Sequence, residues 1–146
     1  MKVQRVYVDT SVIGGCFDEE FAPWSKGLMR HFREGHFVPV VSAPQVVQEQ
    51  YLEILAARAE VLSGSDASDA LAARYQAHGI VPESFAADAE HIALATVSQV
   101  DLLVSWNFKH IVRFDKIRLF GAVNREMGYK EIEIYSPREV TSYEER

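Results

Sequence analysis

The chain has 146 residues, of which 48% are hydrophobic and 25% charged, and its formal net charge is −6. This length and balance are those of one globular domain, residues 1–146, that can bury its own core. The single Cys16 excludes an intrachain disulfide and a cysteine-based zinc site, and no segment approaches the roughly 20 apolar residues of a membrane helix.

The start of the chain, residues 1–5, leads directly into a strand-like run without the apolar stretch of a signal peptide. We therefore expect a cytoplasmic protein that does not contact the membrane.

Hydrophobic periodicity and turn residues predict strands that alternate with helices. In chain order we expect a strand at 3–8, a helix at 21–34, a strand at 37–41, a helix at 42–59, a helix at 67–78, a helix at 82–99, a strand at 102–105, a helix at 113–127, a strand at 131–135 and a terminal helical turn at 136–139. Glycines 35, 79 and 128 are expected to end three of the helices.

This alternation predicts a three-layer α/β/α sandwich with a mostly parallel central sheet and right-handed crossovers. The strand at 3–8 is expected at the centre. Pro39 cannot donate a ladder hydrogen bond, which predicts that the strand at 37–41 lies at an edge or begins late.

Small polar side chains follow the apolar runs of this pattern. Asp9 follows the first run, Asn107 follows the run at 102–104, Glu49 lies on the helix after the second run, and Asp88 lies on an alanine-rich helix. In open α/β proteins the ends of such runs meet at the carboxyl edge of the sheet, where ligands bind. Four oxygen donors there suit Mg²⁺ or Mn²⁺, and a pair of these ions is a common device for cutting phosphodiesters.

Each of these residues also has a simpler interpretation. Asp9 can be a helix N-cap alone. Asp88 can point to solvent, whereas an inward Asp88 needs a charged partner or a metal. His91 shares the helix face of Asp88 and is either a ligand or a core residue held by hydrogen bonds.

Four segments, in this order and spacing, resemble the PIN domain, in particular the VapC-like toxin ribonucleases, over residues 3 to about 140. They are Val8-Asp9-Thr10-Ser11-Val12, Glu49, Asp88-Ala89-Glu90-His91-Ile92-Ala93-Leu94-Ala95 and Leu103-Val104-Ser105-Trp106-Asn107-Phe108. The resemblance implies metal-dependent cleavage of RNA, with Asp9, Glu49 and Asp88 as its acidic residues and Ser11 or Thr10 as its hydroxyl residue. Glu53, one turn after Glu49, is the alternative for the second position.

The sequence departs from the family at its fourth acidic position, which falls on Asn107. An amide oxygen can ligate Mg²⁺ but adds no negative charge, so metal binding and activity are expected to be weaker. Asp115 is a substitute only if it reaches back from the next helix, and Asp101 is expected at the opposite end of its strand.

Residues around Asn107 are candidates for contact with RNA. Trp106 beside the site either packs in the core or stacks on a base, worth about 1–3 kcal/mol, and Phe108 is expected in the core. Segment 109–130 carries a net charge of +4, from Lys109, Arg113, Lys116, Arg118, Arg125 and Lys130 against Asp115 and Glu126. The segment is either a solvated helix face or a rim that contacts RNA phosphates through Lys109 and Arg113.

The first functional hypothesis is a Mg²⁺- or Mn²⁺-dependent endoribonuclease, the toxin of a type II toxin–antitoxin pair. Its catalytic residues are Asp9, Glu49, Asp88 and Asn107, its metal ligands Asp9, Asp88 and Asn107, and its substrate contacts Ser11, Trp106, Lys109 and Arg113. The resemblance also implies an antitoxin protein and a homodimer.

The second hypothesis is a PIN-fold module that binds RNA or a partner protein without cutting, which Asn107 and the acidic net charge favour. A phosphatase-like hydrolase with Asp9 as nucleophile is a third, but position 11 is Ser11 where such enzymes place a second Asp.

Overall fold

A five-stranded parallel sheet forms the middle layer of the structure, a computed structural model that describes residues 2–43 and 58–141. Its strands are β1 (Gln4–Val8), β2 (Phe37–Ser42), β3 (Glu60–Leu62), β4 (Leu102–Val104) and β5 (Ile134–Tyr135), in the order β3-β2-β1-β4-β5. The strand at 3–8 therefore lies at the centre, as predicted. The chain moves outward from β1 to β3 and then returns to β4, so the strand order reverses between β1 and β4. Open sheets bind ligands at such a reversal, beyond the carboxyl ends of the strands.

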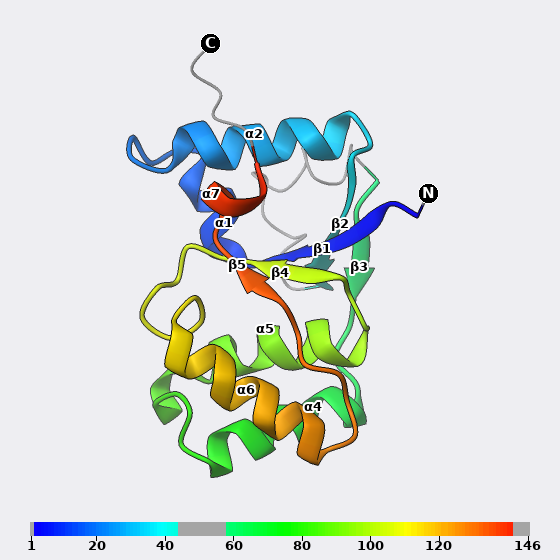
Figure 1. The fold of residues 1–146 in the computed structure, drawn as a ribbon, viewed down its shortest axis with the longest axis vertical. Coiled ribbons are helices and arrows are strands. Elements are labelled where there is room, and N and C mark those ends of the chain that lie inside the picture. The colour runs from blue at the N-terminus through cyan, green and yellow to red at the C-terminus, as the bar shows by residue number, and fades with distance from the viewer. Residues whose placement is uncertain (1, 44–57, 142–146) are drawn as a thin grey trace.

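Helices cover both faces of the sheet and complete the predicted three-layer sandwich (Figure 1). One face carries α1 (Thr10–Gly15), α2 (Ala22–Arg33) and α7 (Pro137–Val140). The other carries α4 (Asp66–Ala77), α5 (Ala86–Val97), which follows the short 3-10 helix η3 (Glu83–Phe85), and α6 (Phe114–Glu126). No helix in the part of the chain that the structure describes has the length and apolar character to cross a membrane.

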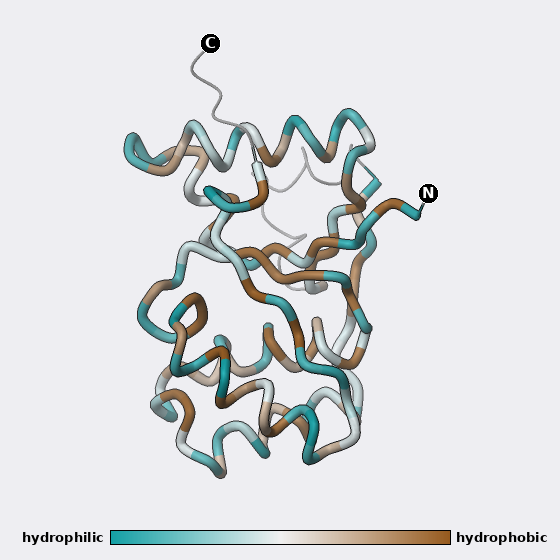
Figure 2. Tube along the Cα trace, in the orientation of Figure 1, coloured by the Kyte–Doolittle hydropathy of each residue, from teal (hydrophilic) through white to brown (hydrophobic). Residues whose placement is uncertain are grey.

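β1, β2, β4 and β5 each contribute side chains to two separate cores. In β1, Tyr7 packs in the core between the sheet and helices α4, α5 and α6, whereas Val6 and Val8 pack in the core between the sheet and helices α1 and α2. Successive strand residues point to opposite faces, so a strand covered on both sides must be apolar at every position. Figure 2 shows the hydrophobic stretches that result in the middle layer.

Glycine ends three helices as the sequence predicted. Gly35, Gly79 and Gly128 follow α2, α4 and α6 with φ angles of 78°, 66° and 87°. This left-handed conformation disfavours other residues, and it turns the chain sharply out of the helix.

The edge position expected for the second strand is wrong, because β3 lies outside it. Pro39 pairs with Val6 of β1, and pairing with β3 begins one residue later, at Val40 with Glu60. The proline therefore precedes the part of β2 that has neighbours on both sides. Neither β3, with three residues, nor α1, with two glycines in six, produces a periodic pattern. Most of the helix expected at 42–59 lies outside the described residues.

Gly15 lets α1 pack closely against the residues after β4. A Cβ atom on Gly15 would lie 2.5 Å from Ser25 Oγ and 2.7 Å from Trp106 Nε1, whereas a Cβ on Gly14 would meet nothing within 4 Å. Trp106 Nε1 also donates a hydrogen bond of 2.8 Å to Ser25 Oγ, which restricts both side chains.

Gly15→Ala is therefore expected to lower the free energy of unfolding by about 1–3 kcal/mol, because the added methyl group forces Ser25 and Trp106 apart. Gly14→Ala in the same helix is the matched control and should raise it by up to about 1 kcal/mol, since alanine favours a helix over glycine. Urea unfolding of both variants measures the difference. Shifts of the same sign and size would contradict the close contact at Gly15.

Candidate active site

Asp9 follows β1 directly and caps the amino terminus of α1. Its Oδ1 accepts hydrogen bonds from the backbone N of Ser11 at 3.1 Å and from Ser11 Oγ at 2.6 Å. The N-cap interpretation is thus confirmed. It does not account for Oδ2, which faces the neighbouring strand.

Ser105 connects Asp9 to the end of β4. Val8 pairs with Val104 in the sheet, so the next residue of each strand, Asp9 and Ser105, also lie side by side. Ser105 Oγ donates to Asp9 Oδ2 at 2.6 Å, and Ser11 Oγ accepts from the backbone N of Trp106 at 2.9 Å. Ser105 was not among the predicted site residues, although its position just past a buried run was the signal that identified Asp9.

Burial dominates the electrostatics of Asp9, whose residue is only 4% exposed. Burial raises the pKa of this carboxyl, and the charge of His91 and the hydrogen bonds from Ser105, Ser11 and Val12 lower it by less. The main cause of the raised pKa is therefore desolvation rather than repulsion between carboxylates. A buried carboxylate held by neutral donors favours a proton or a cation as its next partner.

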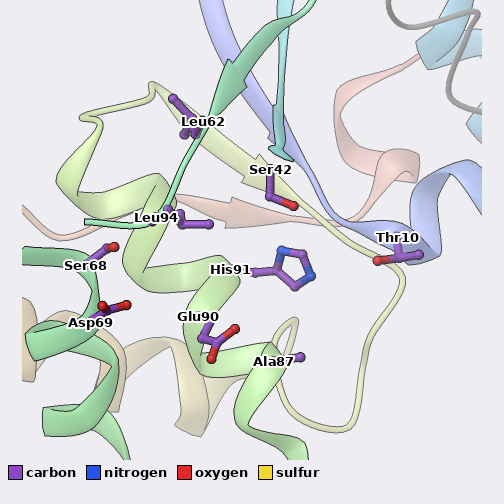
Figure 3. A pocket seen from close by; sticks show the side chains of 10 residues that line it. Thr10, Ser42, Leu62, Ser68, Asp69, Ala87, Glu90, His91 and Leu94 are labelled. Carbon is purple, nitrogen blue, oxygen red and sulfur yellow. The ribbon is translucent and has the colours of Figure 1, made fainter. Parts of the chain in front are cut away.

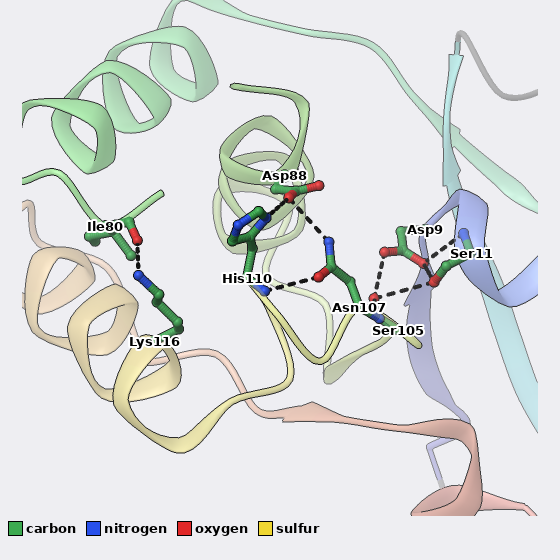
Figure 4. A network of polar contacts seen from close by, with 8 residues as sticks. All are labelled: Asp9, Ser11, Ile80, Asp88, Ser105, Asn107, His110 and Lys116. Carbon is green, nitrogen blue, oxygen red and sulfur yellow. Dashed lines mark hydrogen bonds and ion pairs between the residues drawn. The ribbon is translucent and has the colours of Figure 1, made fainter. Parts of the chain in front are cut away.

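Asp88 points inward from the first turn of α5 (Figure 4). Its Oδ2 lies 3.1 Å from Asn107 Nδ2 and 3.0 Å from His110 Nδ1. The inward orientation was predicted to require a charged partner or a metal, and a protonated His110 is such a partner. His110 is buried and was missed, because a histidine six residues beyond a strand carries no signal in the sequence.

Asn107 is held at both ends of its amide. The backbone N–H of His110 can only donate, so the amide atom 2.9 Å from it is the oxygen, and the amide nitrogen therefore faces Asp88. The backbone N of Asn107 also donates to Ser105 Oγ at 2.9 Å. Hydrogen bonds thus run from Asp9 through Ser105 and Asn107 to Asp88, as Figure 4 shows.

A cavity of about 320 Å³ adjoins Asp9 on the side of β2 and β3. Thr10, Ser42 and Leu62, which lie at or just beyond the carboxyl ends of β1, β2 and β3, line it, and Glu90 and His91 face it from α5 (Figure 3). His91 Nδ1 lies 2.6 Å from the Tyr7 hydroxyl, so His91 is held by a hydrogen bond to the core. The amino-terminal half of α5 thus supplies two residues near the strand-order reversal. Asp88 lies beside Asn107, and His91 lines the cavity.

The two aromatic residues beside Asn107 differ in burial: Trp106 takes the core position that was one of its two alternatives, whereas the expectation for Phe108 is wrong. Trp106 is 6% exposed, and its ring stacks on Phe21 with centroids 4.1 Å apart. Phe108, expected in the core, is 48% exposed. The strand alternation continues past β4 and turns Trp106 toward the core of α1 and α2, so Trp106 offers little surface to an RNA base.

Most basic side chains of segment 109–130 contact other groups of the same chain. Arg113 pairs with Asp115 at 2.9 Å, Arg125 with Glu131 at 3.5 Å, and Lys116 donates to the backbone oxygen of Ile80. Lys109 and Arg118 instead lie over the rings of the exposed residues Phe85 and Phe114.

The two other described acidic candidates, Asp115 and Asp101, are not part of the hydrogen-bonded line from Asp9 to Asp88. Asp115 lies in the first turn of α6, as predicted, and is exposed. Asp101 accepts from the backbone N of Arg5 at 2.6 Å, at the opposite end of the sheet. Glu49 and the alternative Glu53 lie outside the described residues.

Asp9 and Asp88 provide the hard oxygen donors that Mg²⁺ prefers, and this ion is commonly held by one or two carboxylates with several waters. Both described contacts of Asp88 fall on Oδ2, which leaves Oδ1 for another partner. Neither residue belongs to a group of three converging His, Cys, Asp or Glu ligands within residues 2–43 and 58–141. Asn107 can join such a set only if its amide turns over and gives up two hydrogen bonds.

Asp9→Asn is expected to raise the free energy of unfolding of the metal-free protein at pH 7. Burial raises the pKa of Asp9 above its ordinary value of 3.8, so the folded protein binds a proton more readily than the unfolded chain. The destabilisation by Asp9 is therefore complete above the folded-state pKa and disappears as pH falls toward 3.8. Urea unfolding of parent and variant across this range should show the difference closing at low pH.

Asp115→Asn removes an exposed carboxylate and controls for net charge. A difference between parent and Asp9→Asn that stays constant with pH would contradict the assignment of a buried, protonatable Asp9.

Comparison of the chain with protein-family models, with curated proteins and with solved structures found no match.

Proposed function

We propose that the protein is a metal-dependent endoribonuclease, the toxin of a type II toxin–antitoxin pair. The observation that carries the proposal is the line of hydrogen bonds from Asp9 to Asp88 at the strand-order reversal. It brings together three of the segments on which the PIN resemblance rests, from positions 9, 88 and 107. Burial of the Asp9 carboxylate is costly, and a cation bound beside it would offset part of that cost.

The described residues divide into ligands and supports. Asp9 and Asp88 would hold Mg²⁺ or Mn²⁺, which when bound supplies an activated water and stabilises the leaving oxygen in phosphodiester hydrolysis. Ser11 and Ser105 fix the orientation of Asp9 through hydrogen bonds of 2.6 Å each. Asn107 and His110 do the same for Asp88, so we assign Asn107 a positioning role rather than that of a direct ligand.

Exposed aromatic and basic residues near Asp88 and on α6 are suited to single-stranded RNA. We call them the rim and define it as Phe85, Phe108, Lys109, Phe114 and Arg118, whose aromatic members are all at least 43% exposed. Lys109 lies 5.8 Å from the Phe85 ring centroid, and the Phe85 ring lies 4.4 Å from that of His110. Exposed rings stack on bases and cations contact phosphates, so the rim can take the role first expected of Trp106.

The resemblance to VapC-like toxins extends the proposal to partners and location. It implies a cognate antitoxin that covers the site, a second copy of the chain in a homodimer, and action in the cytoplasm. A helix laid over the candidate active site is one common way in which a short segment of a partner protein covers such a surface.

A second candidate function, RNA or protein binding without cleavage, is favoured by the amide of Asn107. This side chain adds no charge and already uses both of its polar atoms, which leaves two described carboxylates to hold a cation. An assay for metal-dependent RNA cleavage distinguishes the two functions, because only the nuclease cleaves RNA.

Asp88→Asn is expected to reduce Mg²⁺-dependent cleavage of a mixed-sequence RNA more than about 100-fold, because it removes a ligand rather than a residue that only orients one. The folded state should persist, since the new amide oxygen can still accept a hydrogen bond from Asn107. Cleavage is measured by gel electrophoresis and folding by the melting temperature.

The matched control is Asp115→Asn, the same change on an exposed helix, which should leave the rate within about twofold. Parental cleavage by Asp88→Asn at saturating Mn²⁺ would place the active site elsewhere.

Asn107→Asp is expected to act in opposite directions with and without metal. It places a carboxylate where Asn107 Nδ2 now donates to Asp88, so the two charges repel and the melting temperature in chelator falls. With Mg²⁺ present the added charge should tighten ion binding and raise cleavage at limiting metal. Mn²⁺ should stimulate the parent more than Mg²⁺ does.

Asn107→Ala is the control, since it removes the same hydrogen bonds without adding charge. The binding-module function predicts instead that Asn107→Asp loses stability equally in chelator and in Mg²⁺, with no cleavage in either.

A further inference from the structure

Three side chains with metal-binding groups meet where α2 ends and the chain turns into β2. His31 Nδ1 lies 2.8 Å from His36 Nδ1, and Glu34 Oε1 lies 3.8 Å from the same nitrogen of His36. One ligand atom from each of the three lies within 4.8 Å of the other two. We call this group the His31–Glu34–His36 cluster.

The backbone holds the cluster in place. The N–H of His36 donates to the carbonyl oxygen of His31 at 2.9 Å, and that of Gly35 donates to Phe32 at 3.2 Å. These two bonds, with Gly35 at φ 78°, form a Schellman motif, which returns the chain toward the last turn of the helix. His36 is therefore brought back beside His31 by the main chain, whether or not a ligand is bound.

Packing also restricts the His31 ring. It lies edge-on to the Phe37 ring, with centroids 5.7 Å apart and an angle of 65°. Two of the three ligands are thus oriented before any ion binds, which reduces the entropy lost on binding.

The donor set selects the class of ion. Two imidazole nitrogens that face each other at 2.8 Å need a proton or a cation between them, because their lone pairs repel. A tetrahedral Zn²⁺ bonded to both would separate them by about 3.3 Å, which requires only a small outward rotation of the rings. Two imidazoles and one carboxylate suit Zn²⁺ and similar transition metals, whereas Mg²⁺ prefers oxygen ligands alone.

Some charges around the cluster favour a bound cation and others oppose it. The carboxyl end of a helix carries partial negative charge and favours a cation there. Arg30 and Arg33 in the same turn oppose it, but each of them has interactions of its own. Glu34 supplies the formal negative charge within the cluster.

We infer that the His31–Glu34–His36 cluster is a binding site for Zn²⁺ or a similar divalent transition metal, separate from the candidate active site. His36 directly precedes β2, whose first residue pairs with Gln4 at the start of β1, whereas Asp9 follows the other end of β1. Figure 1 shows the end of α2 beside the start of β2. A bound ion would fasten this junction and stabilise the fold.

The test is calorimetric titration of the chelator-treated, dialysed full chain with ZnCl₂. The parent should bind one Zn²⁺ per chain at the cluster and gain melting temperature in Zn²⁺. His31→Ala and His36→Ala should each weaken this binding at least tenfold and abolish the gain, and Glu34→Gln should weaken it less. Amide chemical-shift changes on Zn²⁺ addition should centre on residues 31–37.

His78→Ala is the control. It removes another exposed histidine that lies next to a glutamate at a helix end, 3.5 Å from Glu126, and should leave Zn²⁺ binding unchanged. Asp88→Asn removes a carboxylate of the candidate active site, so any Zn²⁺ binding that it abolishes does not occur at the cluster.

Parental Zn²⁺ binding in the double variant His31→Ala/His36→Ala, or loss of binding in Asp88→Asn, overturns the inference.

Discussion

One buried carboxylate, that of Asp9, joins the ends of β1 and β4, the neighbouring strands between which the strand order reverses. Its Oδ1 binds the first turn of α1, and its Oδ2 binds Ser105 beyond β4. A carboxylate removed from water is costly unless donors surround it, so the residues on either side are constrained to supply them. The two serines meet this need, and the adjoining turn then places Asn107 against Asp88. The helix cap, the strand pairing and the candidate site are therefore parts of one arrangement.

The hydrogen bonds that Asp9 accepts come from neutral groups, and His91 adds a charge nearby. The charge of His91 and these hydrogen bonds lower the pKa of the carboxyl, but by less than burial raises it. The site therefore retains an attraction for positive charge. Asp88 differs, because His110 can become its counter-ion and Asn107 holds it from the other side. A divalent ion at this edge would compete with a proton for Asp9 and with His110 for Asp88, so its affinity depends on both.

The layered fold followed from the sequence because its signals are local. The apolar runs of β1 and β4 and the glycines after α2, α4 and α6 each act within a few residues. β3 and α1 were missed because they are short and stabilised by tertiary contacts rather than by a pattern of their own. Asp9 and Asp88 were found from their positions relative to apolar runs. The partnership of Asp88 with His110 and the reversed burial of Trp106 and Phe108 depend on how the turn after β4 folds, which no periodicity encodes.

The hydrogen bond between Asp9 and Ser105 spans 96 residues of chain, and this separation has a consequence for the order of folding. During synthesis Asp9 emerges well before β4, the strand that pairs with β1 beside it. Until β4 docks, one edge of β1 lacks its neighbour, and the carboxylate remains in water with the acidity of an ordinary aspartate. Contacts of such long range also slow folding, since a large loop must close first. The site therefore cannot form before β4 is made, and a nascent or truncated chain that ends before β4 lacks it.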